Sequence, residues 1–136
     1  MSTIAIVQAH IAYELIDEKD PEVVVIEFLS QEIASPLHAL DLGRQLNSLI
    51  RPELPRNYVI DFANVRSLGS TAFGEVANFV RRVGRVRMCN LDHTLRLGAA
   101  LIGLEGIVEF ADSRGAAIRA AKRSEENTLD SVDPVS

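Results

Sequence analysis

The spacing of apolar residues changes once between residues 57 and 84, and this change separates a strand from a helix. Apolar residues run from Tyr58 to Phe62 with only Asp61 between them, which predicts a strand buried on both faces. After a polar loop, apolar residues recur three or four positions apart, which predicts an amphipathic helix beginning at Ser70. The predicted buried stripe of this helix comprises Phe73, Val76, Ala77, Val80 and Val83.

The N-terminal part of the chain predicts two strands and a helix. Residues 4–16 and 22–28 flank a charged turn, so we expect an antiparallel pair of strands. Ser35 supplies a helix N-cap, Pro36 follows at the first helical position, and Pro52 ends the helix. We expect the apolar side of this helix to comprise Leu37, Leu40, Leu46, Leu49 and Ile50.

The C-terminal part continues the alternation. Gly84 is placed to close the central helix in a left-handed conformation, and residues 85–91 predict another strand. A helix then begins at 92–94, and residues 104–110 predict a tight bend followed by a short edge strand. Ser113 can cap a last helix. The expected buried side of the 92–102 helix comprises Leu95, Leu97, Ala99, Leu101 and Ile102.

Strands that alternate with helices indicate one α/β domain: a mixed β-sheet of four to five strands covered by about four helices. With 136 residues, of which 47% are hydrophobic, the chain is long enough for one packed core. We expect this domain to span residues 1–123. Residues 124–136 are polar and acidic, with too little apolar area to offset the entropy of ordering, so they predict a disordered tail.

Composition excludes several functions. The net charge of −5 argues against direct nucleic-acid binding, and we expect the local cluster Arg81, Arg82, Arg85 and Arg87 to divide between a helix end and a strand. The single cysteine, Cys89, excludes an internal disulfide and reads as a core residue. Three histidines without ligand spacing predict no metal or cofactor. Without a long apolar span or a basic leader, we expect a cytoplasmic protein away from the membrane.

The candidate site is the start of the central helix. Ser70 is the predicted N-cap, and Gly69 lets the chain turn into the helix. Ser70 and Thr71 would then present two hydroxyls at the positive end of the helix dipole, where an added anion is favoured. A plain structural cap is the alternative explanation of the same residues.

The order of elements and the residues of this loop resemble the STAS domain family of anti-sigma factor antagonists. Asp61 matches the family's strand aspartate, Gly69 to Gly74 match its loop, and Ile102-Gly103-Leu104 with Ile107-Val108 resembles a later motif. The resemblance covers roughly residues 4–122. The family's loop aspartate is replaced here by Gly69, and its first loop glycine by Ala72.

The resemblance implies a non-enzymatic signalling protein that regulates transcription by binding a partner. In the family, a partner that is both anti-sigma factor and serine/threonine kinase phosphorylates the second loop hydroxyl, and a phosphatase reverses this. By position that residue is Thr71, with Ser70 as its neighbour. The residues expected to bind the partner are Asp61, Gly69, Ser70, Thr71, Ala72, Phe73, Gly74 and Phe79.

Two other functions fit the sequence. A STAS-like scaffold could bind partners, or its own copies as a homodimer, without phosphorylation; Phe79 would then enlarge an exposed patch, or pack at the core's edge. A small enzyme or nucleotide-binding protein is the third hypothesis. Gly69 and Gly74 have P-loop spacing, but Glu75 stands where the lysine belongs and would repel phosphate. Asp61 would be a catalytic base in such an enzyme, or otherwise a cap for loop amides.

Overall fold

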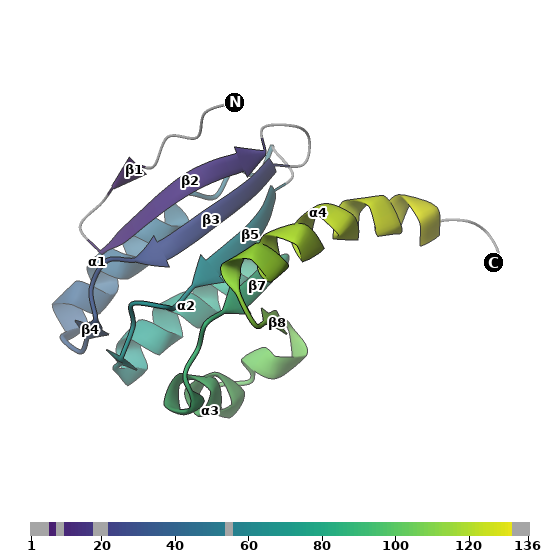
Figure 1. Ribbon diagram of the computed structural model, residues 1–136. Coiled ribbons are helices and arrows are strands. Elements are labelled where there is room, and N and C mark those ends of the chain that lie inside the picture. The colour runs from purple at the N-terminus through teal and green to yellow at the C-terminus, as the bar shows by residue number, and fades with distance from the viewer. Residues whose placement is uncertain (1–5, 8–9, 18–21, 54–55, 132–136) are drawn as a thin grey trace.

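The computed structural model describes residues 6–7, 10–17, 22–53 and 56–131 (Figure 1). Eight strands and four α-helices follow one another in this part of the chain, with a 3₁₀ turn at Leu104–Gly106. The strands are β1 Ile6–Val7, β2 Ile11–Asp17, β3 Glu22–Phe28, β4 Glu32–Ile33, β5 Arg56–Asp61, β6 Ser67–Leu68, β7 Val86–Cys89 and β8 Glu109–Ala111. The helices are α1 Pro36–Asn47, α2 Ser70–Val83, α3 His93–Leu101 and α4 Arg114–Ser131.

The main sheet is mixed, with the strand order β1-β2-β3-β5-β7-β8. Strand β2 is antiparallel to both β1 and β3, which confirms the predicted N-terminal pair, whereas β3, β5, β7 and β8 run parallel to one another. Strand β5 is central, and its residues from 57 to 61 are all buried. The predicted α/β class is confirmed, with β1 added to five longer strands.

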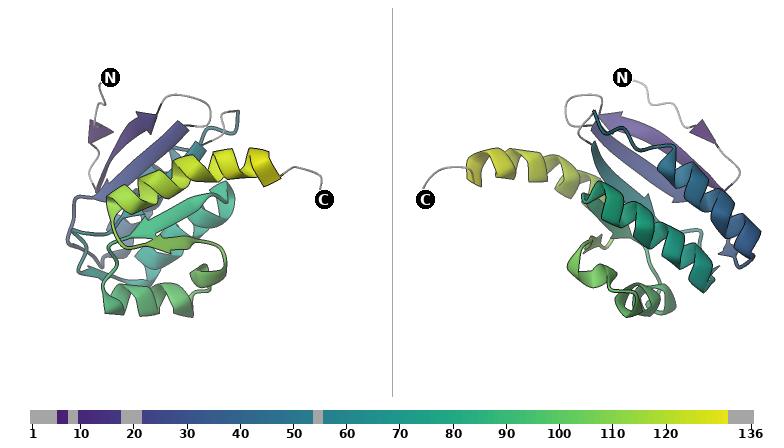
Figure 2. Two further views of the ribbon diagram at one scale, coloured as in Figure 1. Left: turned by 45° about the vertical axis from the view of Figure 1, so that its right-hand side comes forward. Right: turned by 180° about the vertical axis from the view of Figure 1, so that it is seen from behind.

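Side chains of the central strands alternate between two cores, one on each face of the sheet. Helices α1 and α2 lie side by side on one face, and α4 crosses the other (Figure 2). On the first face Ile26, Ile60 and Met88 belong to the larger core, which also takes in Leu95 and Ala99 of α3. The smaller core under α4 comprises Val23, Val25, Val59, Cys89, Ala117 and Ala121.

The predicted stripe of α2 is confirmed, because Phe73, Val76, Ala77 and Val80 are buried. The helix ends at Gly84, whose φ of 78° is the left-handed conformation predicted for that glycine. Helix α1 starts as predicted: Ser35 Oγ accepts from the Leu37 amide at 3.2 Å, and Pro36 is the first helical residue.

The predicted buried sides of α1 and α3 were partly wrong. The side chains of Leu37, Leu40, Leu97 and Leu101 are 73%, 45%, 52% and 86% exposed. At about 100° per residue, Leu37 falls opposite the stripe that packs on the sheet, and Leu40 falls on its flank. That stripe comprises Ala39, Leu42, Gly43 and Leu46 in α1, and Leu95 and Ala99 in α3.

Helix α4 runs on to Ser131, past residue 123, where the sequence predicted the domain to end. Residues 124–131 are therefore helical where we expected a disordered tail; extending a helix that has already formed adds one backbone hydrogen bond per residue without the cost of a new nucleus. The division of the chain at residue 123 remains a prediction.

Candidate functional site

Two short strands bring the starts of α1 and α2 together. Strand β4 pairs with β6 in parallel, Ile33 opposite Leu68, and each strand leads directly into its helix. The pairing extends one step further, because the Gly69 amide donates to the Ile33 carbonyl at 2.9 Å. A Cβ on Gly69 would lie 3.4 Å from the Ala34 backbone, which is ordinary van der Waals contact. The two helices therefore begin next to each other.

The N-cap of α2 is Gly69 and not Ser70, contrary to the prediction. Gly69 is extended, with φ −68° and ψ 166°, and no side chain caps the helix. The hydrogen bond to β4 keeps Gly69 in the strand conformation, so helical geometry begins at Ser70. Ser70 and Thr71 are both exposed to solvent. A phosphate-transferring enzyme could therefore reach both hydroxyls.

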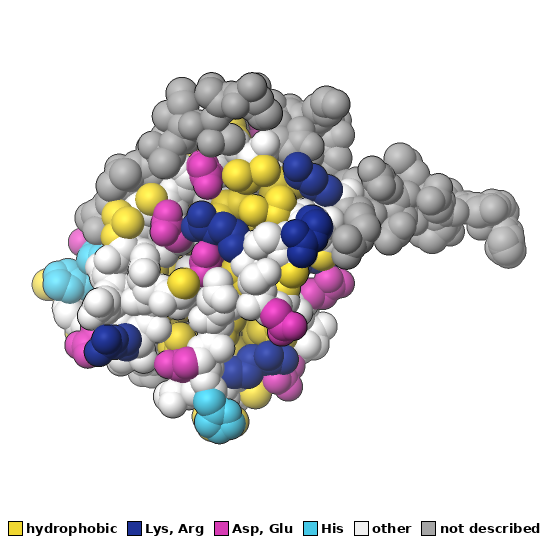
Figure 3. All heavy atoms as spheres, in the orientation of Figure 1, with side chains coloured by type: hydrophobic (Ala, Val, Ile, Leu, Met, Phe, Trp, Pro, Cys, Tyr) yellow, Lys and Arg dark blue, Asp and Glu magenta, His cyan; other side chains and the backbone are white. Residues whose placement is uncertain are grey.

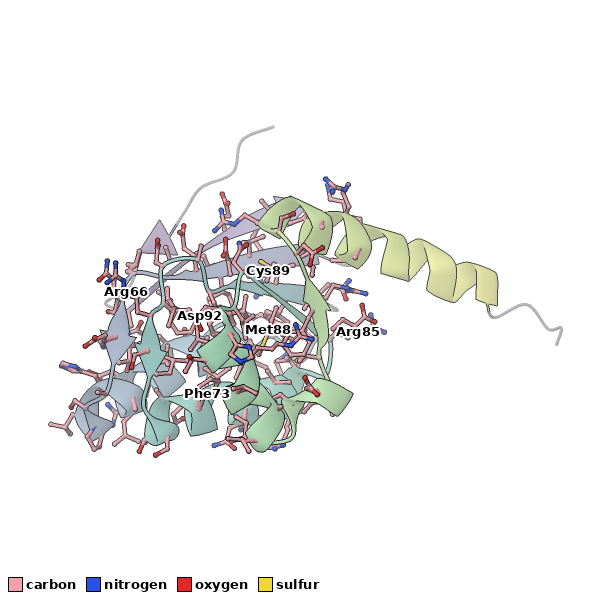
Figure 4. The ribbon with its side chains drawn as sticks, turned by 60° about the horizontal axis from the view of Figure 1, so that its bottom comes forward. Arg66, Phe73, Arg85, Met88, Cys89 and Asp92 are labelled. Carbon is pink, nitrogen blue, oxygen red and sulfur yellow. The ribbon has the colours of Figure 1, made fainter. Side chains whose placement is uncertain are left out.

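The helix dipoles favour negative charge near these hydroxyls, and the carboxylate of Glu75, one turn further along α2, opposes it. Neither α1 nor α2 has an acidic residue in its first turn. The positive ends of the two helix dipoles therefore lie beside each other without a carboxylate on either first turn. Arg66, which is exposed in the loop before β6, adds a positive charge on this side of the domain (Figure 4).

Four of the residues expected to bind a partner are buried: Ala72, Phe73 and Phe79 in the core, and Asp61 on the opposite face of the sheet. Phe79 is fully buried and packs edge to face on Tyr58, with ring centroids 5.1 Å apart, so it is a core residue and cannot enlarge an exposed patch. Ala72 is 1% exposed and Phe73 8% exposed. Gly74 is half-buried, with open space where a Cβ would be. Ser70 and Thr71 are the exposed members of the predicted set.

Exposed leucines lie on the two helices that flank α2. Helix α1 packs along one side of α2, and α3 approaches the other side, where Phe73 fills the space next to Gly98 and Arg81 Nη2 donates to the Ile102 carbonyl at 3.0 Å. Of the six large hydrophobic side chains that are exposed among the described residues, four belong to these helices: Leu37, Leu40, Leu97 and Leu101. Their apolar character predicts burial in the core, which is wrong for all four. Their spacing around each helix was the signal that would have identified them.

Asp61 is a structural centre on the opposite face of the sheet. Its Oδ1 accepts from the Ala63 amide and from Asn90 Nδ2, both at 2.9 Å, and its Oδ2 accepts from Arg114 Nε at 2.9 Å. The carboxylate is 7% exposed. The bond to Ala63 agrees with the predicted capping of loop amides. Asp61 therefore holds β5, the loop after β7 and α4 together.

Arg114 and Asn90 were not identified from the sequence. They lie 53 and 29 positions from Asp61, and no local pattern indicates either contact. Arg114 also lies 3.5 Å from Glu27 and 3.8 Å from Glu14. Asn90 has a φ of 63°, the one positive φ of a non-glycine residue among those described. The hydrogen bond from its side-chain amide to Asp61 stabilises that conformation.

Cys89 lies next to this centre and is fully buried, as predicted. Burial, reinforced by the negative charge of Asp61, raises the pKa of its thiol from 9.0 to about 12. We therefore expect Cys89 to react very slowly with iodoacetamide at pH 8 in the folded protein and rapidly in urea, as followed by mass spectrometry.

The same pKa shift predicts how stability depends on pH. Between pH 9 and 12 the folded protein keeps a proton on Cys89 that the unfolded chain loses, so stability should fall as the pH rises through this window. A Cys89→Ala variant should lose part of this alkaline dependence. Fast alkylation of the native protein would contradict the assignment.

The nucleotide-binding hypothesis gains no support from the loop. Glu75 points at α1, where a Cβ on Gly43 would overlap its carboxylate. The start of α2 therefore has a carboxylate one turn along the helix and no lysine beside it.

Among the described residues, the histidines form no metal site. The rings of His10 and His38, which are far apart in sequence, lie 5.3 Å apart, yet no three metal-ligating side chains gather anywhere in the described part of the chain.

The charged side chains give no broad basic surface on the face that carries α4, where both signs are interspersed (Figure 3). The arginines 81, 82, 85 and 87 divide as predicted: the first two in the last turn of α2, Arg85 in the following loop and Arg87 in β7. No helix in the described ranges has both the length and the apolar character to cross a membrane.

The fold is that of anti-sigma factor antagonists, the STAS fold. An anti-sigma factor antagonist from Mycobacterium paratuberculosis superposes with a TM-score of 0.65 at 22% identity, covering 82% of this chain and 94% of that one. A putative antagonist from Thermotoga maritima gives 0.61 at 16%, covering 82% and 93%. The phosphorylated form of the Bacillus cell fate determinant SpoIIAA gives 0.57 at 20%, covering 79% and 98%. No protein-family model and no curated sequence matches the chain.

Proposed function

We propose that this protein is a non-enzymatic regulatory module that binds an anti-sigma factor through the start of α2 and is released when Thr71, or its neighbour Ser70, is phosphorylated. The observation that carries the proposal is the pair of exposed hydroxyls at the joined N-termini of α1 and α2. The partner would be both anti-sigma factor and kinase, with a separate phosphatase that restores binding.

The surface around Thr71 supports protein binding. The exposed leucines of α1 and α3 lie on the helices that flank α2 and supply apolar contact area on either side of it. Leu37 in particular lies in the first turn of α1, next to the first turn of α2. A partner that covers Thr71 would bury Leu37 in the same contact.

The geometry also supports a switch that leaves the fold intact. A phosphate adds about −1.5 to −2 charges and three strong acceptors. The joined helix starts lack carboxylates in their first turns, so this domain tolerates the new charge, whereas a partner that presents apolar or acidic groups there would be repelled. Among the structural neighbours, SpoIIAA is described in a phosphorylated and an unphosphorylated form.

Charge substitution at Thr71 tests the proposal directly. We expect Thr71→Glu to weaken binding of the anti-sigma kinase from the source organism by about tenfold or more, and Thr71→Ala to preserve it. Titration calorimetry with the purified kinase measures both. Unchanged melting temperatures would show that the fold is intact, and equal binding by the two variants would refute the switch.

A matched pair of leucine variants tests the contact surface. Leu37→Ser should weaken binding while leaving stability nearly unchanged, because the side chain is 73% exposed. Leu29→Ser, at another exposed leucine that lies outside the helices flanking α2, serves as the control. Phosphopeptide mapping after incubation with the kinase separates the switch from a constitutive scaffold: a scaffold would bind normally and show no phosphate on Ser70 or Thr71.

A further inference from the structure

A pocket of about 240 Å³ opens at the end of the domain where α1 and α2 finish. Four arginines line it together with Tyr58 and three apolar side chains: Arg51 after α1, Arg56 at the start of β5, Arg82 in the last turn of α2, and Arg85 before β7. Four guanidinium groups around one small cavity are unusual in a chain whose net charge is −5. None of the lining residues is acidic.

Main-chain carbonyls hold the guanidinium groups of Arg51 and Arg56. Arg51 Nη1 donates to the carbonyls of Ser48 and Ile50 at 2.9 and 3.1 Å. Arg56 Nη1 donates to the Leu49 carbonyl at 2.7 Å, and its Nε pairs with Glu22 at 2.7 Å. The Arg85 carbonyl accepts from the Tyr58 amide at 3.0 Å, which places Arg85 beside the same strand.

These contacts satisfy carbonyl groups that would otherwise face an anion here. Carbonyls at the C-terminal end of a helix carry partial negative charge. Arg51, Arg56 and the Tyr58 hydroxyl donate to the carbonyls of residues 48–50, which follow α1, and the Tyr58 hydroxyl lies 3.2 Å from the Leu49 oxygen. The described bonds of Arg51 and Arg56 use only some of the five N–H donors that each guanidinium has. The pocket therefore presents donors and positive charge.

Tyr58 contributes a neutral wall. Its side chain is 3% exposed, and burial raises the pKa of its phenol above the ordinary value of 10.0 despite the nearby Arg56. The phenol stays uncharged at physiological pH and adds no repulsion to an anion. Together with Ile50, Pro52 and Val83 it forms the apolar part of the lining.

We propose that this arginine pocket binds a small phosphate-bearing molecule, whose phosphate sits between Arg51 and Arg56 on one side and Arg82 and Arg85 on the other. Planar guanidinium groups match phosphate oxygens in pairs of parallel hydrogen bonds. The volume lies below the roughly 300–1,000 Å³ of pockets that enclose drug-sized ligands, so it suits a phosphate with a small organic group. This site is independent of the proposed switch.

The pocket and the hydroxyl pair occupy opposite ends of the same helix. Ser70 begins α2 and Arg82 lies in its last turn, and twelve residues of helix span about 18 Å. Arg66 and Arg85 mark the two ends of the domain in Figure 4. The amides whose chemical shifts change on titration therefore show at which end of the helix an anion binds.

Amide NMR of the full chain at low ionic strength tests the proposal, with inorganic phosphate, ribose 5-phosphate and ribose as probes. We expect the two phosphates to shift the amides of Val83, Gly84 and Arg85 saturably and ribose to shift none. Tighter binding of ribose 5-phosphate than of inorganic phosphate would identify an organic phosphate as the better ligand. Shifts confined to residues 70–73, or no saturable shift below about 10 mM, would overturn the proposal.

Two adjacent arginines provide a matched pair of variants. Arg82→Gln should weaken phosphate binding about tenfold, because a charge-assisted donor is lost from the pocket. Arg81→Gln removes the same charge one residue away, but Arg81 donates to the Ile102 carbonyl and does not line the pocket, so binding should change less than about twofold. Equal weakening by both variants would indicate general charge attraction and overturn the site.

Discussion

Replacing Phe79 by alanine is expected to lower the free energy of unfolding by about 3–5 kcal/mol. The ring has no exposed surface and packs edge to face on Tyr58, so truncation leaves a cavity between α2 and the sheet and removes the aromatic pair. Domains of this size have a total stability of about 5–15 kcal/mol, so the variant should be close to unfolding at physiological temperature. Urea denaturation followed by circular dichroism measures the loss.

Two further variants give this prediction its controls. Phe79→Leu keeps most of the buried volume and should cost clearly less than alanine. Asn78→Ala, at the exposed neighbouring position, should change stability by no more than about 0.5 kcal/mol. If Phe79 were a partner contact, the alanine variant would keep its stability and lose binding, which is the opposite pattern.

Replacing Asp61 by alanine is expected to cost about 2–3 kcal/mol, the second largest effect. The substitution removes the acceptor of the Ala63 amide, of Asn90 and of Arg114 in one step. Arg114 is one third exposed and keeps Glu27 within 3.5 Å, so its guanidinium is not left in isolation and the cost stays below that of a fully buried unpaired charge. The midpoint of urea unfolding measures the effect.

Asp61→Asn separates the hydrogen bonds from the charge. Asparagine keeps one carbonyl oxygen for Ala63 and Asn90 but loses the ionic bond to Arg114, so we expect roughly half of the alanine effect. The carboxylate lies on the sheet face that carries α4, and the α2 start lies on the other side. Asp61→Asn should therefore leave partner binding unchanged. If a variant of normal stability failed to bind, Asp61 would be a partner contact, contrary to this prediction.

Short-range patterns were enough to predict the longer strands and the helices of this fold, but not the two-residue strands β4 and β6. The near-continuous apolar run of β5, the three-and-four spacing of α2 and the turn residues between them depend on neighbours only a few positions apart. Ser35-Pro36 at the start of α1 and Gly84 at the end of α2 act through their own backbone geometry, so the sequence located both ends correctly. The resemblance of residues 69–74 to the STAS loop then predicted how the elements assemble.

The candidate site was predicted in part. The position of Ser70 and Thr71 at the start of a helix follows from local spacing, and the structure leaves both side chains exposed. Gly69 became the N-cap because the pairing of β4 with β6 reaches as far as its amide, a contact with Ile33 across 36 positions that local rules do not contain. Phe79 is likewise buried in the core by a long-range contact, its packing on Tyr58.

The sequence by itself determined the longer strands, the helices and the pair of hydroxyls, because hydrophobic period and turn chemistry act over a few residues. Tertiary structure alone decided the order of the strands, the meeting of Asp61 with Arg114 and Asn90, and the gathering of four arginines into one pocket. These depend on how distant segments pack against a shared sheet. Charges and hydroxyls acquire a function only where that packing places them together at the surface.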